Sequence, residues 1–196
     1  MDQRKIKRFI NSKNNGVLGI DKGYMIDGYV IKTINHWKIE DSLKKVYPDY
    51  KPGETDVYIN GKKSNANCGR GKGIIEALHK TLKETKQNID KLDKLEDTGV
   101  NIDSYLKGED ARVYKNTKTG ELIMLQEWYT DAFGLNEKDL YRTEILGGTP
   151  IDPVVFYDNV TEQIYCLILP IRPAMSDGEY VILTEVNYVI DNYKEE

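Results

Sequence analysis

The chain has 196 residues, of which 39% are hydrophobic and 31% are charged, and its formal net charge is −4. This length suits one ordinary domain or two small ones, with a core that needs no disulfide bonds for stability. No run approaches the roughly 20 apolar residues of a membrane span, and the basic N-terminus lacks the features of a signal peptide. We therefore expect a cytoplasmic protein that makes no membrane contact.

Charge is unevenly distributed along the chain. Residues 1–13 carry five basic residues against one acidic residue, and residues 69–94 carry seven against four. Residues 102–196 carry eighteen acidic residues against eight basic ones. Such segregation indicates either a basic face for a polyanion or an acidic face for a basic partner.

The first third of the chain predicts short elements. Apolar residues at positions 6, 9 and 10 indicate an amphipathic helix over residues 2–12, and residues 17–34 read as two or three antiparallel strands. A short helix over 38–46, a proline-fixed loop over 47–53 and a strand over 56–59 follow. Residues 60–73 are polar and rich in glycine, which predicts a loop.

A long helix is predicted over residues 73–96, because apolar residues recur there every three or four positions with lysines between them. Residues 97–110 read as an acidic connection, 111–125 as a hairpin and 137–146 as a short helix. Strands are predicted over 153–157, 164–169 and 179–183, with Cys166 as a core residue. The fold class is therefore α+β.

The chain shows no known catalytic motif: we find no nucleophile elbow, no paired-histidine metal motif and no Walker A loop. Its two cysteines and two histidines lie far apart in the sequence. We therefore predict no enzyme activity, no catalytic residues, no cofactor and no metal. Aspartates 27, 49, 56 and 158 stand beside turn residues, where aspartate usually caps the backbone. The glycines of residues 69–73 leave two interpretations, a phosphate cradle or a flexible basic loop.

Several segments, taken in order, resemble one domain of a DNA sliding clamp. Residues 24–31 (Tyr-Met-Ile-Asp-Gly-Tyr-Val-Ile) look like the clamp strand with a Thr-Asp-Gly core, and residues 46–50 (Val-Tyr-Pro-Asp-Tyr) look like its Phe/Tyr-Pro-Asp-Tyr loop. Residues 167–172 look like the closing strand that ends in Met-Pro-Met-Arg. The resemblance is to the bacterial polymerase III β-subunit type, as in shortened phage-encoded versions.

This resemblance implies a clamp-like domain over residues 1–173, with two helices packed on an antiparallel sheet, an extended second helix and a C-terminal extension over 174–196 that adds a strand. Clamp helices face DNA phosphates, which would assign DNA contacts to Arg4, Lys5, Lys7, Arg8, Lys80, Lys83 and Lys86. Clamps also hold replication proteins in an apolar groove. By correspondence with that groove, partner contacts would involve Leu169, Pro170, Ile171 and Arg172.

The expected function is thus non-enzymatic binding to double-stranded DNA, to a replication protein or to both. A clamp ring needs six such domains, so this chain would form a homo-oligomer, join another clamp or not encircle DNA. One alternative is an enzyme on an unrecognised scaffold, which would bind a metal or nucleotide beside residues 69–73. The other alternative is a phage or mobile-element inhibitor. In that case the acidic residues of 102–196 would mimic DNA and occupy a basic nucleic-acid site on a host or defence enzyme.

Overall fold

A computed structural model describes residues 16–33, 41, 43–104, 109–132 and 143–171. In this part of the chain eleven strands form one sheet in the order β5-β4-β1-β2-β3-β11-β10-β9-β6-β7-β8, and every neighbouring pair is antiparallel. In chain order the strands are Val17–Asp21 (β1), Tyr24–Ile26 (β2), Val30–Thr33 (β3), Asp56–Ile59 (β4), Lys62–Ser64 (β5), Asp93–Ser104 (β6), Glu109–Asn116 (β7), Leu122–Gln126 (β8), Thr143–Gly147 (β9), Val154–Asp158 (β10) and Gln163–Ile168 (β11).

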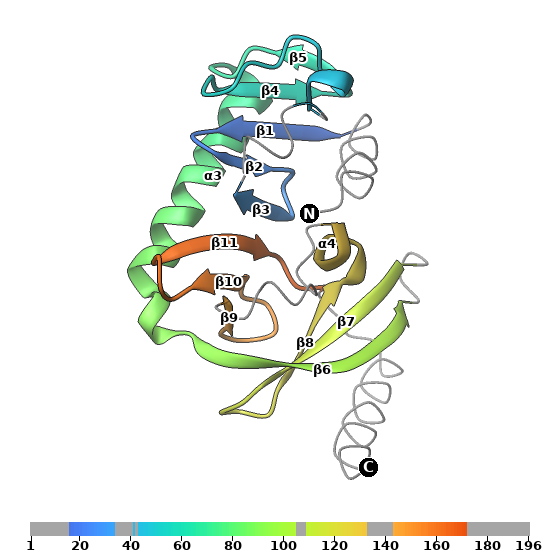
Figure 1. Ribbon diagram of the computed structural model, residues 1–196, viewed down its shortest axis with the longest axis vertical. Coiled ribbons are helices and arrows are strands. Elements are labelled where there is room, and N and C mark those ends of the chain that lie inside the picture. The colour runs from blue at the N-terminus through green and yellow to red at the C-terminus, as the bar shows by residue number, and fades with distance from the viewer. Residues whose placement is uncertain (1–15, 34–40, 42, 105–108, 133–142, 172–196) are drawn as a thin grey trace.

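One long helix covers one face of the sheet. Helix α3 (Gly69–Asn88) crosses the strands from β4 towards β10 and continues into the 3-10 turn η2 (Ile89–Lys91) (Figure 1). A short helix, α4 (Glu127–Ala132), follows β8, and residues 43–46 are also helical. None of the described helices is both long and apolar enough to cross a membrane.

Alternation along the strands gives the sheet two apolar faces, since successive side chains in a strand point in opposite directions. On β3, Ile31 belongs to the cluster under α3, whereas Val30 belongs to the cluster on the opposite face. We call these the helix-side core and the far-side core. The helix-side core consists of Ile26, Ile31, Leu78, Leu146, Val155, Ile164 and Leu167, with partly buried Tyr24, Ile74, Leu82, Ile89, Leu92 and Tyr157.

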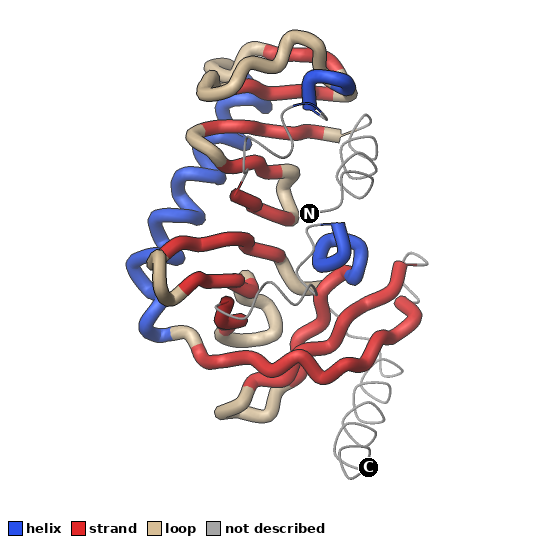
Figure 2. The backbone as a smooth tube through the Cα atoms, in the orientation of Figure 1, coloured by secondary structure: helices blue, strands red, loops and turns tan. Residues whose placement is uncertain are grey.

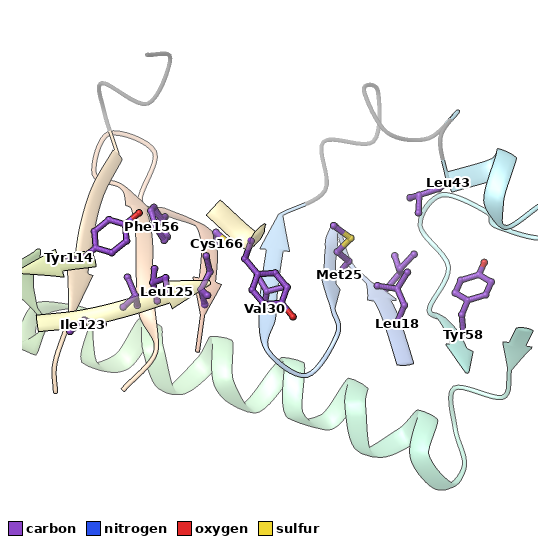
Figure 3. Packing of buried hydrophobic residues seen from close by; sticks show 14 of the residues in the cluster. Leu18, Met25, Val30, Leu43, Tyr58, Tyr114, Ile123, Leu125, Phe156 and Cys166 are labelled. Atoms are coloured by element: carbon purple, nitrogen blue, oxygen red, sulfur yellow. The ribbon is translucent and has the colours of Figure 1, made fainter. Parts of the chain in front are cut away.

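The far-side core is larger and contains no residue of α3. Figure 3 shows its side chains as a continuous band from Tyr58 on β4 to Tyr114 on β7. Strands β6 to β8 turn out of the line of the other strands and pack over β10 and β11 (Figure 2). At this contact the rings of Tyr114 and Phe156 meet edge to face, with their centroids 6.3 Å apart.

Strand β11 comes late in the chain but lies in the middle of the sheet, between β3 and β10. The residues after it also tie the middle of the curved sheet to its β8 edge. The Leu169 N–H donates to the Tyr29 carbonyl beside β3, and the Ile171 N–H donates to the Met124 carbonyl on β8, each at 2.8 Å. The predicted strands over 153–157 and 164–169 are confirmed, as are the strands within 17–34 and 56–59 and the 111–125 hairpin.

The predicted helix over 73–96 is wrong at both ends. It begins earlier, at Gly69, and it ends at Asn88, so the expected extension of this helix is not present. Leu92 is extended, with φ −80° and ψ 142°, and β6 begins one residue later. Leu92 packs in the helix-side core and Leu95 in the far-side core. Two residues three positions apart lie on opposite faces of a strand but on the same face of a helix. The packing of Leu92 and Leu95 in different cores therefore requires an extended backbone.

Three other predictions are wrong. Residues 97–110 are not a connection, because most of them belong to β6 and β7. Residues 143–146, predicted as the end of a helix, lie in β9, and the predicted loop over 60–73 contains β5 and the start of α3. The helix predicted over 2–12 and the strand predicted over 179–183 lie outside the described residues.

Candidate nucleic-acid interface

The candidate interface is the outer face of α3. Ile74, Leu78 and Leu82 repeat at four-residue spacing and pack into the helix-side core, so the opposite side of the helix faces solvent. The helix contains five basic and two acidic residues. Lys80, Lys83 and Lys86, which the clamp resemblance selects, are all exposed on this helix.

Two of the lysines on α3 are held by glutamates one turn further along. Lys72 lies 3.6 Å from Glu76, and Lys80 lies 3.9 Å from Glu84. Exposed pairs of this kind are weak and exchange readily with other partners. In the part of the chain that the structure describes, no carboxylate lies within 4.0 Å of the Lys83 or Lys86 ammonium group. These two charges are therefore available to an anion.

The first turn of α3 contains the glycine-rich residues 69–73, which are helical rather than a flexible loop. Gly71 is buried against the preceding turn, since a Cβ at this position would lie 2.5 Å from the Asn65 carbonyl oxygen. The N-cap residue Cys68 makes no side-chain capping bond, and the first turn contains no acidic residue. Gly71 therefore has a packing role here, and the phosphate-cradle interpretation stays a prediction.

A buried carboxylate holds the middle of α3 to the sheet. The Nε2 atom of His79 lies 2.6 Å from Oδ2 of Asp21, the last residue of β1. The Thr55 hydroxyl donates to the other oxygen of Asp21. Burial raises the pKa of the Asp21 carboxyl, but the bonds from Thr55 and His79 outweigh it, so its pKa is lowered.

Sequence reasoning missed this pair. Asp21 and His79 are 58 residues apart in the sequence. No spacing signal joins them, because a helix crossing a sheet brings residues together at a separation that only the fold determines. The pairing of β1 with β4 also brings Thr55 close, since Ile20 lies opposite Asp56.

A second buried carboxylate, Asp56, is bound by Lys63 at 2.6 Å across the β4–β5 hairpin. The Lys63 ammonium also donates to the Asp49 carbonyl, which fastens the predicted proline loop to this hairpin. Asp56 is thus a strand residue with an ion pair rather than a turn cap. Asp27 and Asp158 do cap turns, since each accepts backbone N–H groups two and three residues further along.

The predicted partner-binding residues lie at the far end of β11. Leu169 is 42% exposed and stands next to Tyr29, which is 59% exposed. Pro170 is buried and Ile171 is half-buried. The predicted partner contact Arg172 lies outside the described residues, as do the predicted DNA contacts Arg4, Lys5, Lys7 and Arg8.

Several carboxylates of the acidic C-terminal half have internal partners. Asp152 accepts from the Thr149 backbone and hydroxyl, and Glu127 accepts from the Asn101 amide. Eight of the eighteen carboxylates in residues 102–196 lie outside the described residues. Among the residues described, no three histidine, cysteine or acidic side chains lie close enough to hold a metal ion. Cys68 and Cys166 are both free, with Cys166 buried.

The described residues define a mixed α/β protein built on one large antiparallel sheet. No family model, no curated protein and no solved structure matches this chain. The resemblance to a sliding-clamp domain therefore stays a prediction, and the outer face of α3 is the basis for a proposal about function.

Proposed function

We propose that the protein is a non-enzymatic, sliding-clamp-like binding protein that contacts the phosphate backbone of double-stranded DNA through the outer face of α3. The observation that carries the proposal is the placement of Lys80, Lys83 and Lys86 on the exposed side of a helix that crosses the sheet. Cations on such a helix neutralise phosphates and release counterions, and this gives affinity without reading the base sequence.

The test is the salt dependence of binding to a duplex of mixed sequence. Replacing the three lysines with alanine should lower the affinity and reduce the slope of log K against log salt by about one unit per lysine. The matched control replaces Lys44, Lys45 and Lys118, which are exposed on other elements. The proposal fails if both triple variants lose affinity equally, or if the native chain shows no salt-dependent binding.

A second contact is proposed for a replication protein at the exposed pair Tyr29 and Leu169. An apolar pair of this kind, beside backbone held by the bond from the Leu169 N–H to the Tyr29 carbonyl, suits a short apolar peptide. Peptides tiled across a replicative polymerase provide the probe. Leu169→Asp should abolish capture of any peptide that the native chain binds, whereas Val160→Asp, at an exposed apolar residue in the β10–β11 turn, should not.

The inhibitor alternative makes a different prediction. A DNA mimic would bind a basic protein and would ignore DNA at all salt concentrations. Reversing the charge of exposed Glu121 and Glu162 should then weaken capture of a basic nucleic-acid-binding protein, while the α3 lysine variant should leave it unchanged.

A further inference from the structure

His79 lies in the middle of the basic face of α3. Lys72, His79 and Lys86 are spaced seven residues apart, and Lys83 follows His79 by one helical turn. Residues with these spacings share one stripe of a helix. The His79 side chain is 48% exposed, so it reaches solvent between the lysines while one ring nitrogen contacts Asp21.

The contact with Asp21 determines which ring nitrogen carries the proton. The Asp21 side chain is only 5% exposed, and its lowered pKa keeps it ionised and able only to accept hydrogen bonds. Nε2, at 2.6 Å, must therefore be the donor in the neutral ring. Nδ1 is then a bare acceptor when the ring is neutral, and it becomes a donor only when a second proton binds.

We propose that His79 is a proton-dependent phosphate contact within the α3 interface, so that the affinity of this face for a polyanion rises as the pH falls. The inference rests on the proposed function and names a regulation of the same surface. A neutral ring offers a phosphate oxygen only a lone pair. A protonated ring offers an N–H donor and a positive charge beside Lys83, and such charge-assisted bonds are the stronger kind.

Other charged groups surround this site and bear on its pH dependence. On α3 the charged neighbours of His79 lie next to it or one turn away, and the sheet contributes Asp21, the following lysine and the tyrosine opposite Asp21 on β2. These groups are Glu76, Lys80, Lys83, Asp21, Lys22 and Tyr24. A pH dependence that belongs to His79 must therefore be separated from these groups, and the His79→Gln variant does so because it leaves all of them in place.

The chain supplies its own control, because its other histidine, His36, lies outside the described residues and away from α3 in the sequence. The experiment measures fluorescence anisotropy of a labelled duplex of about 20 base pairs at constant ionic strength, from about pH 8 to pH 5.5. The native chain should bind about tenfold more tightly at the acid end, as expected for one added charge-assisted bond. His79→Gln should bind with little pH dependence, and His36→Gln should behave as the native chain does.

The outcomes separate the two proposals. If the native chain and His79→Gln bind DNA with the same pH dependence, His79 has no such role while the α3 interface stands. If the native chain binds no DNA at any pH, the proposed function fails and this inference fails with it. Imidazole ¹⁵N spectra of the native chain need no variant. They should show the Nε2–H tautomer in the free protein, and an Nδ1–H tautomer would overturn the proposal.

Discussion

The Tyr129 hydroxyl donates a hydrogen bond to the Asp27 carboxylate at 3.1 Å, although the two residues are 102 positions apart. The other oxygen of Asp27 accepts the backbone N–H groups of Tyr29 and Val30. Asp27 therefore fixes the β2–β3 turn and also fastens α4 to it. Both side chains are buried, so water cannot replace the bond between them.

Removal of this hydroxyl should destabilise the protein. Tyr129→Phe keeps the ring in the far-side core but deletes a hydrogen bond to a charged group, which costs about 1.5–3 kcal/mol of unfolding free energy. Urea unfolding followed by circular dichroism measures the change. Tyr29→Phe is the control, because that side chain is 59% exposed, and its effect should be close to zero. Equal stabilities for the two variants would mean that the Asp27–Tyr129 bond contributes nothing.

Two glycines in the first turns of α3 should respond to alanine with opposite signs. A Cβ at Gly73 meets nothing within 4 Å, so Gly73→Ala should stabilise the helix by up to about 1 kcal/mol. A Cβ at Gly71 would lie 2.5 Å from the Asn65 carbonyl oxygen, and this backbone atom cannot move without shifting the turn. Gly71→Ala should therefore lower the melting temperature while Gly73→Ala raises it. Stabilisation by both substitutions would contradict the close packing of α3 on the 65–68 turn.

Stability should depend on Asp21 in the acid range. The pKa of this carboxyl is lowered in the folded protein, so its ionised form stabilises the fold above the unfolded pKa, which is about 3.9. That stabilisation is lost as the pH falls through the lower, folded pKa. Asp21→Asn removes the titration, so the native chain should be more stable than this variant at about pH 6 by roughly 1.5–3 kcal/mol. The difference should shrink below about pH 4. Urea unfolding across this range checks the result, and a difference independent of pH would contradict it.

The strands of the first third and the β10–β11 pair could be predicted from the sequence, because their apolar residues form short runs that are separated by tight turns. The turn at Lys22 and Gly23, both at positive φ, is an example of such a local signal. Leu92 and Leu95 could not be assigned in this way, since their spacing fits a helix and the lysines around them fit its polar side. The end of α3 at Asn88 is a tertiary effect, because Leu95 completes a core with Tyr114, Ile123 and Phe156 from distant segments.

The site was predictable only in part for a similar reason. Lys80, Lys83 and Lys86 could be assigned to a solvent face because helical periodicity is local. The bond between His79 and Asp21 could not, because it depends on the crossing of α3 over β1. The acidic residues of β6 were also wrongly predicted, as a connection. Asp97 borders a bulge in this strand. At the bulge Arg112 binds Asp97 through two parallel hydrogen bonds, which no local sequence signal indicates.

The two cysteines should differ strongly in reactivity, which tests the central position of β11. Cys166 is fully buried opposite Lys32 on β3, and burial raises the pKa of its thiol to about 12 despite a smaller opposing effect of the Lys32 ammonium. Cys68 is exposed at the start of α3. A thiol reagent should therefore modify one cysteine per native chain quickly and both cysteines in denaturant.

The buried thiol reacts only when the sheet opens, so its modification should be at least about 10³-fold slower than that of Cys68. Cys68→Ser should leave a native chain without a fast-reacting thiol, whereas Cys166→Ser should keep the fast phase unchanged. Mass spectrometry after a timed pulse of iodoacetamide identifies which residue has reacted. Fast modification of Cys166 in the native chain would place β11 at an open edge, and the pairing of β11 with β3 would then be wrong.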